Sequence, residues 1–450
     1  MSRPLLWNPL LFTFCHPLGY ELFAMRAKLF VCICVVTMGC ADRSAQWEQT
    51  GATISRNSQG AIVGINLAAF EGSHSQLSDL ASFPRLTTLT LGASVGDADL
   101  AHLAPLAQLK KLYLKDTRVT DVGLAHLGSL NLRVLELPAR AQTNLGLQHM
   151  MAAMAPAASL NLKGWDITDL GLSELVRWPQ LRQVSLKGTA IGDAGVTHLG
   201  RLERLEYLGL GATQVTDAGI VHLRQLQHLQ RLFLSGTAVT NDGLAHLSGL
   251  VSLQRLTLEG TGVSDAGLAH LKTLAQLQRL SLEGTAVSDA GLVHLSGLLS
   301  LEVLVLSDSQ VTDAGLVHLR GLASLKSLGL GQLEITDEGL VHLMRLNKLE
   351  HLYLNRTRIS DAGVARINHF PRLQLLYLSA NGLTDAGIAH LADVRSLELL
   401  YLNGTRVSDH GLRHLENLPR LKVLVLLNTD TTTAGVGRLR KSLSGCVIHR

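Results

Sequence analysis

Apolar residues recur along this chain at two alternating spacings, and the alternation itself repeats every 24 residues. In VSDAGLAHLKTLAQLQRLSLEGTA, residues 263–286, leucines first stand three residues apart and then two apart. The three-residue spacing suits one face of a short helix, and the two-residue spacing suits a strand with one buried side. Residues 287–310, VSDAGLVHLSGLLSLEVLVLSDSQ, repeat the pattern. Each unit therefore predicts a strand, a turn, a short helix and another turn, which together form one right-handed coil.

The same pattern can be followed along most of the chain. Fifteen strand segments are predicted, starting at Leu86, Leu109, Leu132, Ala157 and Leu181 and then every 24 residues to Leu421. Residues 62–67, IVGINL, are typical of an N-terminal capping coil, and the ending SLSGCVIHR is typical of a terminal strand. Residues 139–159 depart most from the pattern, so we expect the local curvature to change there. Repetition at this period indicates a solenoid.

A single coil cannot bury its own leucines, so each coil must be covered by the next. Parallel strands lie about 4.8 Å apart, which predicts one concave sheet roughly 70 Å long. Helices need about 8–10 Å between their axes, so the stack must bend with the sheet on its inner side. The predicted fold class is α/β, with one solenoid domain over residues 62–450.

The spacing L-x-x-L-x-L-x-x-T-x-V in residues 277–287 resembles the leucine-rich repeat, and the helical half resembles the ribonuclease-inhibitor-like subclass. The resemblance implies a horseshoe-shaped or arc-shaped solenoid with a concave parallel sheet and short convex helices. The family usually has Asn or Cys at the ninth position, bonded to neighbouring coils. This chain mostly has threonine there, at Thr117, Thr189, Thr213, Thr237, Thr261, Thr285, Thr357 and Thr405. We expect these hydroxyls to form an equivalent ladder between coils.

Composition narrows the functional classes. Apolar residues make up 46% of the chain but aromatic residues only 4%, so the core must consist mainly of leucine, valine and alanine. The net charge of +4 is small for 450 residues and does not indicate a nucleic-acid-binding protein. The five cysteines contain no C-x-x-C pair, so neither a redox motif nor a zinc motif is predicted.

The pattern of the first forty residues is typical of a targeting segment. Arg26 and Lys28 follow Met25 and precede an apolar stretch, residues 29–39, which is too short to cross a bilayer. The Gly-Cys pair at its end resembles the lipobox of exported bacterial lipoproteins, which implies acylation of Cys40 and a bacterial membrane anchor. The alternatives are a plain secretory signal and a true start at Met25. Residues 41–61 are polar and predict a short tether.

Repeated histidines are the most metal-like feature. They recur at His102, His126, His198, His222, His246, His270, His294, His318, His342, His390 and His414. Only His410 and His414 form an H-x-x-x-H pair within a repeat. No other repeat has one, and histidines on neighbouring helices are too far apart to share a zinc ion. We therefore interpret them as structural residues in the last turn of each helix. No metal or other cofactor is predicted.

No catalytic cluster is predicted either. The repeated aspartates, such as Asp265 and Asp289, are interpreted as helix-start residues. Serine and threonine alternate freely at the position before them, as capping residues do. The Gly-x-Gly pairs at residues 209–211 and 329–331 lack the third glycine of a phosphate-binding loop and fall on strands.

The predicted concave face carries two candidate binding features. The outward third positions of adjacent strands read Arg231, Arg255 and Arg279, with Glu259 and Glu283 two outward positions farther on. Like charges in register repel each other, and an acidic partner would relieve that repulsion. The alternative is that the arginine side chains diverge into water.

The second feature lies toward the C-terminus and is aromatic and aliphatic. Its residues are His351, Tyr353, Leu375, Tyr377, Leu399, Tyr401 and Val423. Exposed surfaces of this kind are typical of protein interfaces. The alternative is that the tyrosines stack across strands and only strengthen the sheet.

The sequence therefore predicts a non-enzymatic, monomeric recognition scaffold. It would be exported, lipid-anchored in the lipoprotein interpretation, and would bind an unknown protein or peptide. Two alternatives remain: a substrate-receptor adaptor of a ubiquitin-ligase type complex, since the repeat also resembles such receptors, and a protein inhibitor of an enzyme.

Overall fold

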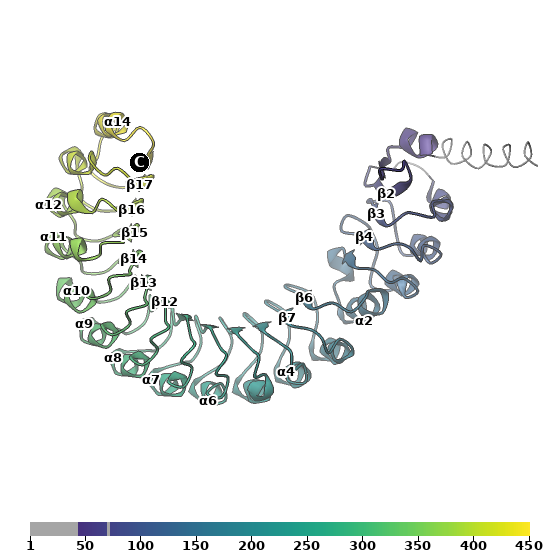
Figure 1. Ribbon diagram of the computed structural model, residues 1–450, viewed down its shortest axis with the longest axis horizontal. Coiled ribbons are helices and arrows are strands. Elements are labelled where there is room, and N and C mark those ends of the chain that lie inside the picture. The colour runs from purple at the N-terminus through teal and green to yellow at the C-terminus, as the bar shows by residue number, and fades with distance from the viewer. Residues whose placement is uncertain (1–43, 70–72) are drawn as a thin grey trace, which may run out of the picture. The chain divides into compact units, whose positions relative to one another are not determined.

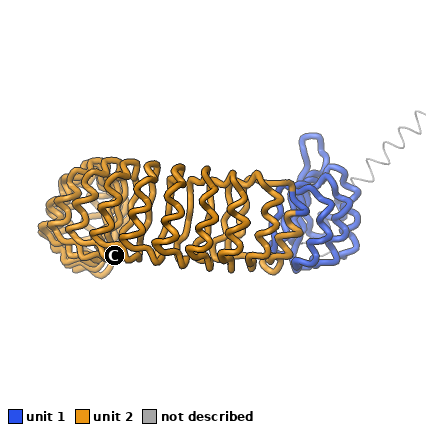
Figure 2. The backbone as a smooth tube through the Cα atoms, turned by 90° about the horizontal axis from the view of Figure 1, so that it is seen from below, with its two compact units in different colours: residues 1–138, 152–154 blue, residues 139–151, 155–450 orange. Residues whose placement is uncertain are grey.

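The computed structural model describes residues 44–69 and 73–450, which fall into two compact units. Unit 1 runs to residue 138 and includes residues 152–154, and unit 2 comprises residues 139–151 and 155–450 (Figure 2). The predicted targeting segment, residues 1–40 with Cys40, lies outside the described residues. Within the described part, no helix is long and apolar enough to cross a membrane.

Unit 1 contains a five-stranded sheet in chain order, in which the first pair is antiparallel and the other pairs are parallel. Its strands are β1 (Thr53–Arg56), β2 (Ile62–Leu67), β3 (Thr88–Leu91), β4 (Lys111–Tyr113) and β5 (Val134–Glu136). Besides a short α-helix over residues 44–49, it contains the 3-10 helices η1 (His74–Ser82), η2 (Ala98–Leu103) and η3 (Gly123–Leu127).

The predicted tether is instead ordered structure over residues 44–61. Residues 44–49 are helical and bury Trp47, and β1 pairs with the predicted capping strand β2. The side chain of Asn57 accepts hydrogen bonds from two backbone N–H groups of the connecting turn. A polar composition suggested a tether, but pairing with β1 satisfies backbone groups that would otherwise stay open at the edge of the sheet.

Unit 2 contains a thirteen-stranded parallel sheet in chain order. Its strands are β6 (Ser159–Asn161), β7 (Gln183–Ser185), β8 (Tyr207–Gly209), β9 (Arg231–Phe233), β10 (Arg255–Thr257), β11 (Arg279–Ser281), β12 (Val303–Val305), β13 (Ser327–Gly329), β14 (His351–Tyr353), β15 (Leu375–Tyr377), β16 (Leu399–Tyr401), β17 (Val423–Val425) and β18 (Val447–His449). The sheet is open and lines the inner side of this unit's curve, with the helices on the outer side (Figure 1).

Most helices of unit 2 begin as α-helix and tighten into 3-10 geometry. The α-helices are α2 (Asn144–Ala153), whose residues 152 and 153 belong to unit 1, α3 (Asp169–Leu172), α4 (Asp193–Leu199), α5 (Asp217–Ile220), α6 (Asn241–Ala245), α7 (Asp265–Leu268), α8 (Asp289–Leu292), α9 (Asp313–Leu316), α10 (Asp337–Leu343), α11 (Asp361–Val364), α12 (Asp385–Ala389), α13 (Asp409–Leu412) and α14 (Thr433–Ser442). The 3-10 segments are η4 (Ala139–Ala141), η5 (Ser173–Arg177), η6 (Val221–Gln225), η7 (Ala269–Leu271), η8 (Val293–Leu295), η9 (Val317–Leu319), η10 (Ala365–His369), η11 (His390–Asp393) and η12 (Arg413–Leu415).

The fifteen predicted strand segments are confirmed as β3–β17, each beginning two residues after its predicted start. The sequence predicts one continuous sheet, whereas the described residues form two. The interruption falls in residues 139–159, where the pattern is weakest. There the ten-residue helix α2 stands where most other coils have a shorter α-helix.

The repeated leucines form the core. Leu256 and Leu280 pair in register on β10 and β11, and each is at most 1% exposed. Leu268 on α7 and Leu292 on α8 are also fully buried. Because a leucine returns to the same place in every coil, each coil covers the apolar side of its neighbour.

A second set of contacts joins the coils through aspartate. Oδ1 of Asp265 accepts the backbone N–H of Ser288, one coil farther on, at 2.7 Å, and Oδ2 accepts the Ser288 hydroxyl at 2.6 Å. The same two bonds recur from Asp97 to Thr120, Asp193 to Thr216, Asp217 to Thr240, Asp289 to Thr312, Asp313 to Thr336, Asp337 to Ser360, Asp361 to Thr384, Asp385 to Ser408 and Asp409 to Thr432. We call this series the aspartate ladder. The aspartates do start helices, as predicted, but their side chains also connect neighbouring coils.

The aspartate ladder explains the glycine of the Asp-Ala-Gly motif. A Cβ on Gly291 would lie only 2.4 Å from Oδ1 of Asp265. Glycine is therefore needed at this position because the carboxylate of the preceding coil occupies the space of a side chain.

The prediction that the ninth-position threonine hydroxyls form a ladder between coils is wrong. The hydroxyl of Thr285 donates to the carbonyl of Leu282 in its own coil at 2.6 Å, and the other ninth-position threonines behave in the same way. Only at Thr357 does the hydroxyl also donate to another coil, to Oδ1 of Asn381 at 2.9 Å. The shorter threonine side chain reaches its own turn, while asparagine spans both coils.

Candidate functional site

The three predicted tyrosines stack on the concave face of unit 2. Tyr353 (β14), Tyr377 (β15) and Tyr401 (β16) occupy directly opposed register positions. The rings of Tyr353 and Tyr377 lie 5.2 Å apart between centroids at 26°, and those of Tyr377 and Tyr401 lie 3.8 Å apart at 10°. We call these three residues the tyrosine stack. Each ring is half-buried, so the stack both strengthens the sheet and leaves part of its surface open.

The environment favours the neutral form of two of these phenols, Tyr353 and Tyr377. Burial, followed by the influence of Tyr401, raises the pKa of Tyr353 above its ordinary value of 10. Burial, the hydrogen bond with Tyr401 and the neighbouring phenols raise the pKa of Tyr377 further. The hydroxyl groups of Tyr353 and Tyr377 therefore stay protonated near neutral pH and are available as uncharged donors and acceptors.

The predicted aliphatic residues form a parallel row beside the tyrosine stack. His351, Leu375, Leu399 and Val423 oppose one another in register on β14–β17, and all four are half-buried. Together with the tyrosine stack they form what we call the aromatic patch. The structure therefore brings all seven predicted residues together on one surface.

Sequence reasoning missed two residues that continue this surface. Leu427 follows β17 and is 45% exposed, and Val447 on β18 is 55% exposed. Val447 pairs in register with Val423, so the same outward-position rule could have identified it.

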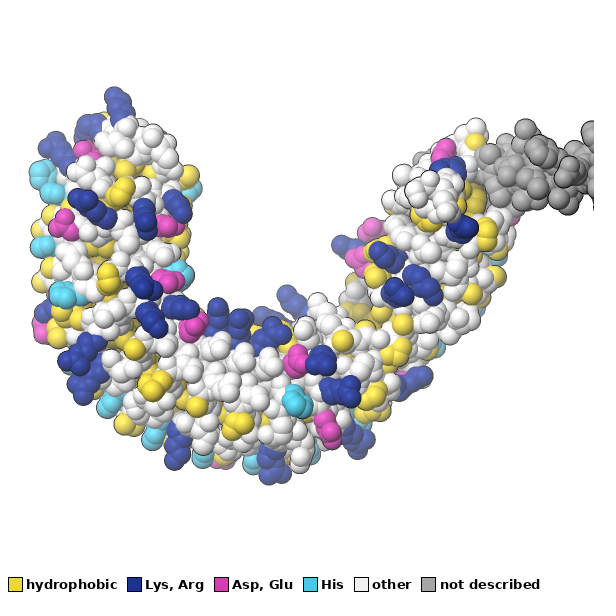
Figure 3. Space-filling view, viewed as in Figure 1, with side chains coloured by type: hydrophobic (Ala, Val, Ile, Leu, Met, Phe, Trp, Pro, Cys, Tyr) yellow, Lys and Arg dark blue, Asp and Glu magenta, His cyan; other side chains and the backbone are white. Residues whose placement is uncertain are grey.

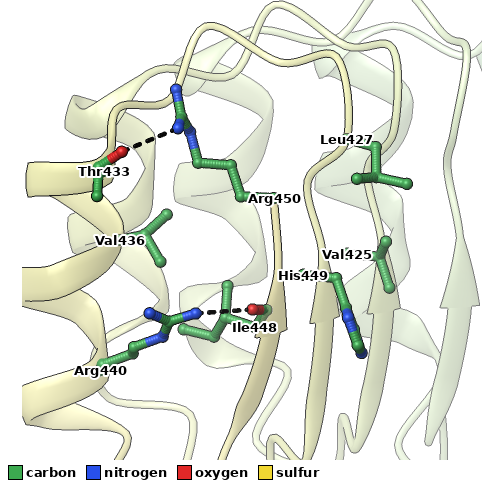
Figure 4. Close-up of a pocket in the computed structure, with 8 residues that line it drawn as sticks. All are labelled: Val425, Leu427, Thr433, Val436, Arg440, Ile448, His449 and Arg450. Atoms are coloured by element: carbon green, nitrogen blue, oxygen red, sulfur yellow. Dashed lines mark hydrogen bonds between the residues drawn. The ribbon is translucent and has the colours of Figure 1, made fainter.

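The end of the array also contains a hollow of about 500 Å³ (Figure 4). It is lined by Val425, Leu427, Thr433, Val436, Arg440, Ile448, His449 and Arg450. Arg440 donates to the carbonyl of Ile448 at 3.0 Å, and Arg450 donates to the Thr433 hydroxyl at 3.1 Å. Both guanidinium groups therefore take part in holding β18 against α14.

The predicted arginines form a separate feature on β9–β11. Arg231, Arg255 and Arg279 oppose one another directly, and in the part of the chain that the structure describes none of them forms an ion pair. Arg231 lies over the ring of Tyr207 at 5.3 Å, a cation–π contact that sequence reasoning missed. We call the three arginines the arginine row. Strands β12 and β13 separate the arginine row from the aromatic patch, so these are two separate features on one face.

The repeated histidines of unit 2 lie in or directly after its helices, and histidine side chains are seen along the outer side of this unit (Figure 3). His270 and His294, for example, occupy the last turns of η7 and η8, as the sequence predicts. Over residues 44–69 and 73–450, no three His, Cys, Asp or Glu side chains are grouped so that they could hold a metal ion.

Comparison with known proteins adds a family match. A family model described as a leucine-rich repeat region matches residues 157–407, more than half of the chain. An internalin from Listeria monocytogenes is 24% identical, with a TM-score of 0.51, and the match covers 68% of this chain and 88% of the internalin. A leucine-rich-repeat protein from Leptospira interrogans is 18% identical, with a TM-score of 0.46, over 85% of this chain and 99% of that one. The comparison with curated proteins gives no match.

Proposed function

The chain belongs to the leucine-rich-repeat family, and from that premise we propose that the concave face of unit 2 binds a protein or peptide partner without catalysing a reaction. The observation that carries this proposal is the aromatic patch: an open row of stacked tyrosines beside half-buried aliphatic side chains. Tyrosine offers a large contact area and a hydroxyl at a low cost in conformational entropy. The helix in each coil supports assignment to the ribonuclease-inhibitor-like subclass.

The aromatic patch would supply most of the affinity, and the arginine row would orient the partner. Rigid stacked rings lose little freedom on binding, which favours affinity. Exposed charges contribute more to orientation and to association rate than to affinity. The protein would act as a monomer.

Peptides selected from a random twelve-residue display library on the wild-type chain provide a probe for this function. The double substitution Tyr377→Ser and Tyr401→Ser is expected to weaken their binding by on the order of a hundredfold, measured by fluorescence anisotropy. Serine already occupies the equivalent strand position at Ser281, so the fold should persist.

Tyr113→Ser is the matched control, because Tyr113 is a half-buried tyrosine at the equivalent strand position of unit 1. Its affinity for the selected peptides should equal that of the wild type. Unchanged affinity of the Tyr377 and Tyr401 variant would refute the assignment of the aromatic patch.

We also propose that the chain is exported and anchored to a bacterial membrane through an acyl group on Cys40. The positive charges at Arg26 and Lys28, the apolar residues 29–39 and the Gly-Cys pair support this. Mass analysis of the N-terminus of the native protein should find Cys40 as the first residue with a diacylglyceryl mass. An intact Met1 would overturn export by this route.

A further inference from the structure

The concave face carries acidic groups as well as the arginine row. Glu259 and Glu283 follow β10 and β11, two outward positions beyond Arg255 and Arg279. Asp308 lies in the turn after β12, and its Oδ2 is 3.9 Å from where a Cβ on Gly284 would stand. We call Glu259, Glu283 and Asp308 the acidic row. It runs across neighbouring coils, as the arginine row does.

Between the two rows, one hydroxyl is buried without a partner. Ser281 on β11 is 7% exposed, and its Oγ makes no hydrogen bond. Strand alternation directs it to the same side as Arg279 and Glu283, because its neighbours Leu280 and Leu282 are buried in the core. A buried hydroxyl without a partner destabilises the free protein, which suggests that a ligand supplies the missing bond.

The neighbouring coil shows the contrast. On β10, Thr257 occupies the position opposite Ser281, and its hydroxyl lies 2.8 Å from the Ser235 hydroxyl, so these two groups satisfy each other. Ser281 makes no such bond: Glu259 stands where the preceding coil would place the equivalent of Ser235, and Val305 is opposite Ser281 on β12.

The charges of the two rows do not neutralise each other within the described residues. No ion pair joins Arg255 or Arg279 to a carboxylate there. Partial burial, followed by the nearby charges of Glu259 and Asp308, raises the pKa of Glu283 above its ordinary value of 4.5. The face therefore presents repelling positive charges along one line and repelling negative charges along another.

We propose that this charged face binds a peptide segment of the partner that bears both an acidic and a basic side chain. The acidic side chain lies against Arg255 and Arg279, the basic one lies against Glu259 and Glu283, and the hydroxyl of Ser281 donates to a carbonyl or carboxylate oxygen of the segment. The inference rests on the proposed function and specifies the chemistry of its partner.

Charge complementarity favours such a segment over a ligand of one sign. An anion alone would leave the acidic row uncompensated, and a cation alone would leave the arginine row uncompensated. A nucleic acid would meet the carboxylates directly, so its phosphates would be repelled from half of the face.

The test compares peptides that different full-length variants select from the random twelve-residue library. Peptides enriched by the wild type should carry both an acidic and a basic residue. Arg255→Gln with Arg279→Gln should abolish the preference for acidic residues, and Glu259→Gln with Glu283→Gln should abolish the preference for basic ones. Each double substitution should lower the affinity for peptides selected on the wild type roughly five- to tenfold. Arg320→Gln and Glu203→Gln, exposed residues outside the strands, are the matched controls and should change neither preference.

Ser281→Ala adds a readout that a purely structural role would not produce. This substitution should lower the affinity for the selected peptides several-fold. The urea midpoint of the free chain should stay unchanged or rise, because the substitution removes a buried hydroxyl that has no partner. If the Ser281→Ala variant binds the selected peptides as tightly as the wild type does, Ser281 is not part of the binding site.

The outcomes separate this inference from the function on which it rests. Enriched peptides that depend on Tyr377 and Tyr401 but show no preference for charge would overturn the charged face alone. If the wild type enriches no peptide at all, the proposed function fails and the charged face fails with it.

Discussion

Replacing Gly291 with alanine is expected to lower the free energy of unfolding by about 2–4 kcal/mol. Alanine is the better helix former by about 1 kcal/mol, so helix propensity alone predicts the opposite sign. The added Cβ would stand 2.4 Å from Oδ1 of Asp265, and that carboxylate would have to move. Its two bonds to Ser288 would then break. The urea midpoint measures the loss, and amide hydrogen exchange should place it in the two coils concerned.

Gly297→Ala is the matched control for this substitution. Gly297 lies only six residues farther on, in the turn after η8, and a Cβ there would meet no atom within 4 Å. This variant should be as stable as the wild type or up to about 1 kcal/mol more stable, because alanine restricts the unfolded chain. Equal effects of Gly291→Ala and Gly297→Ala would contradict the steric role of the aspartate ladder.

The substitution Asp289→Ala is expected to lower the free energy of unfolding by about 2–4 kcal/mol, which is the second large effect that we expect. Oδ1 of Asp289 accepts the Thr312 N–H at 2.7 Å, and Oδ2 accepts the Thr312 hydroxyl at 2.6 Å. Alanine would remove both acceptors and leave a part-buried N–H of the next coil without a partner, which costs more than the loss of a solvated bond. Hydrogen exchange at the Thr312 amide should speed up more than exchange elsewhere in unit 2.

Asp289→Asn separates hydrogen bonding from charge. Asn241 already occupies this position on α6: its Oδ1 accepts the Ser264 N–H at 2.8 Å, and its Nδ2 donates to the Ser264 hydroxyl at 2.8 Å. Asparagine at position 289 should therefore lower the free energy of unfolding by less than about 1 kcal/mol. A loss as large as that of Asp289→Ala would mean that the negative charge, rather than the pair of bonds, joins the coils.

The fold was largely predictable because its pattern is one-dimensional. Leu256 and Leu280 were expected in register on adjacent strands, and the structure pairs them. The prediction failed where the pattern weakened, since the sheet is interrupted beside the ten-residue helix α2. It failed again for residues 44–61, whose polar composition did not reveal that β1 pairs with β2.

The candidate site was predictable as a set of positions but not as a set of interactions. Strand alternation placed Tyr353, Tyr377 and Tyr401 on one face, but the stacking distances depend on how each ring turns against its neighbour. Likewise, the pattern aligned Arg255 with Arg279, but only the tertiary structure shows that neither forms an ion pair within the described residues and that the Ser281 hydroxyl has no partner.

By itself, the sequence determined that this chain is a stack of coils with a parallel sheet. A leucine that returns once in every 24 residues can be removed from water only by the coil before it and the coil after it. The tertiary structure alone decided which polar groups join those coils: the aspartate at the helix start, such as Asp265, reaches the next coil, while the ninth-position threonine, such as Thr285, bonds to a carbonyl of its own coil. The physical reason is that leucine burial needs only the right period, whereas a hydrogen bond needs two particular atoms about 3 Å apart.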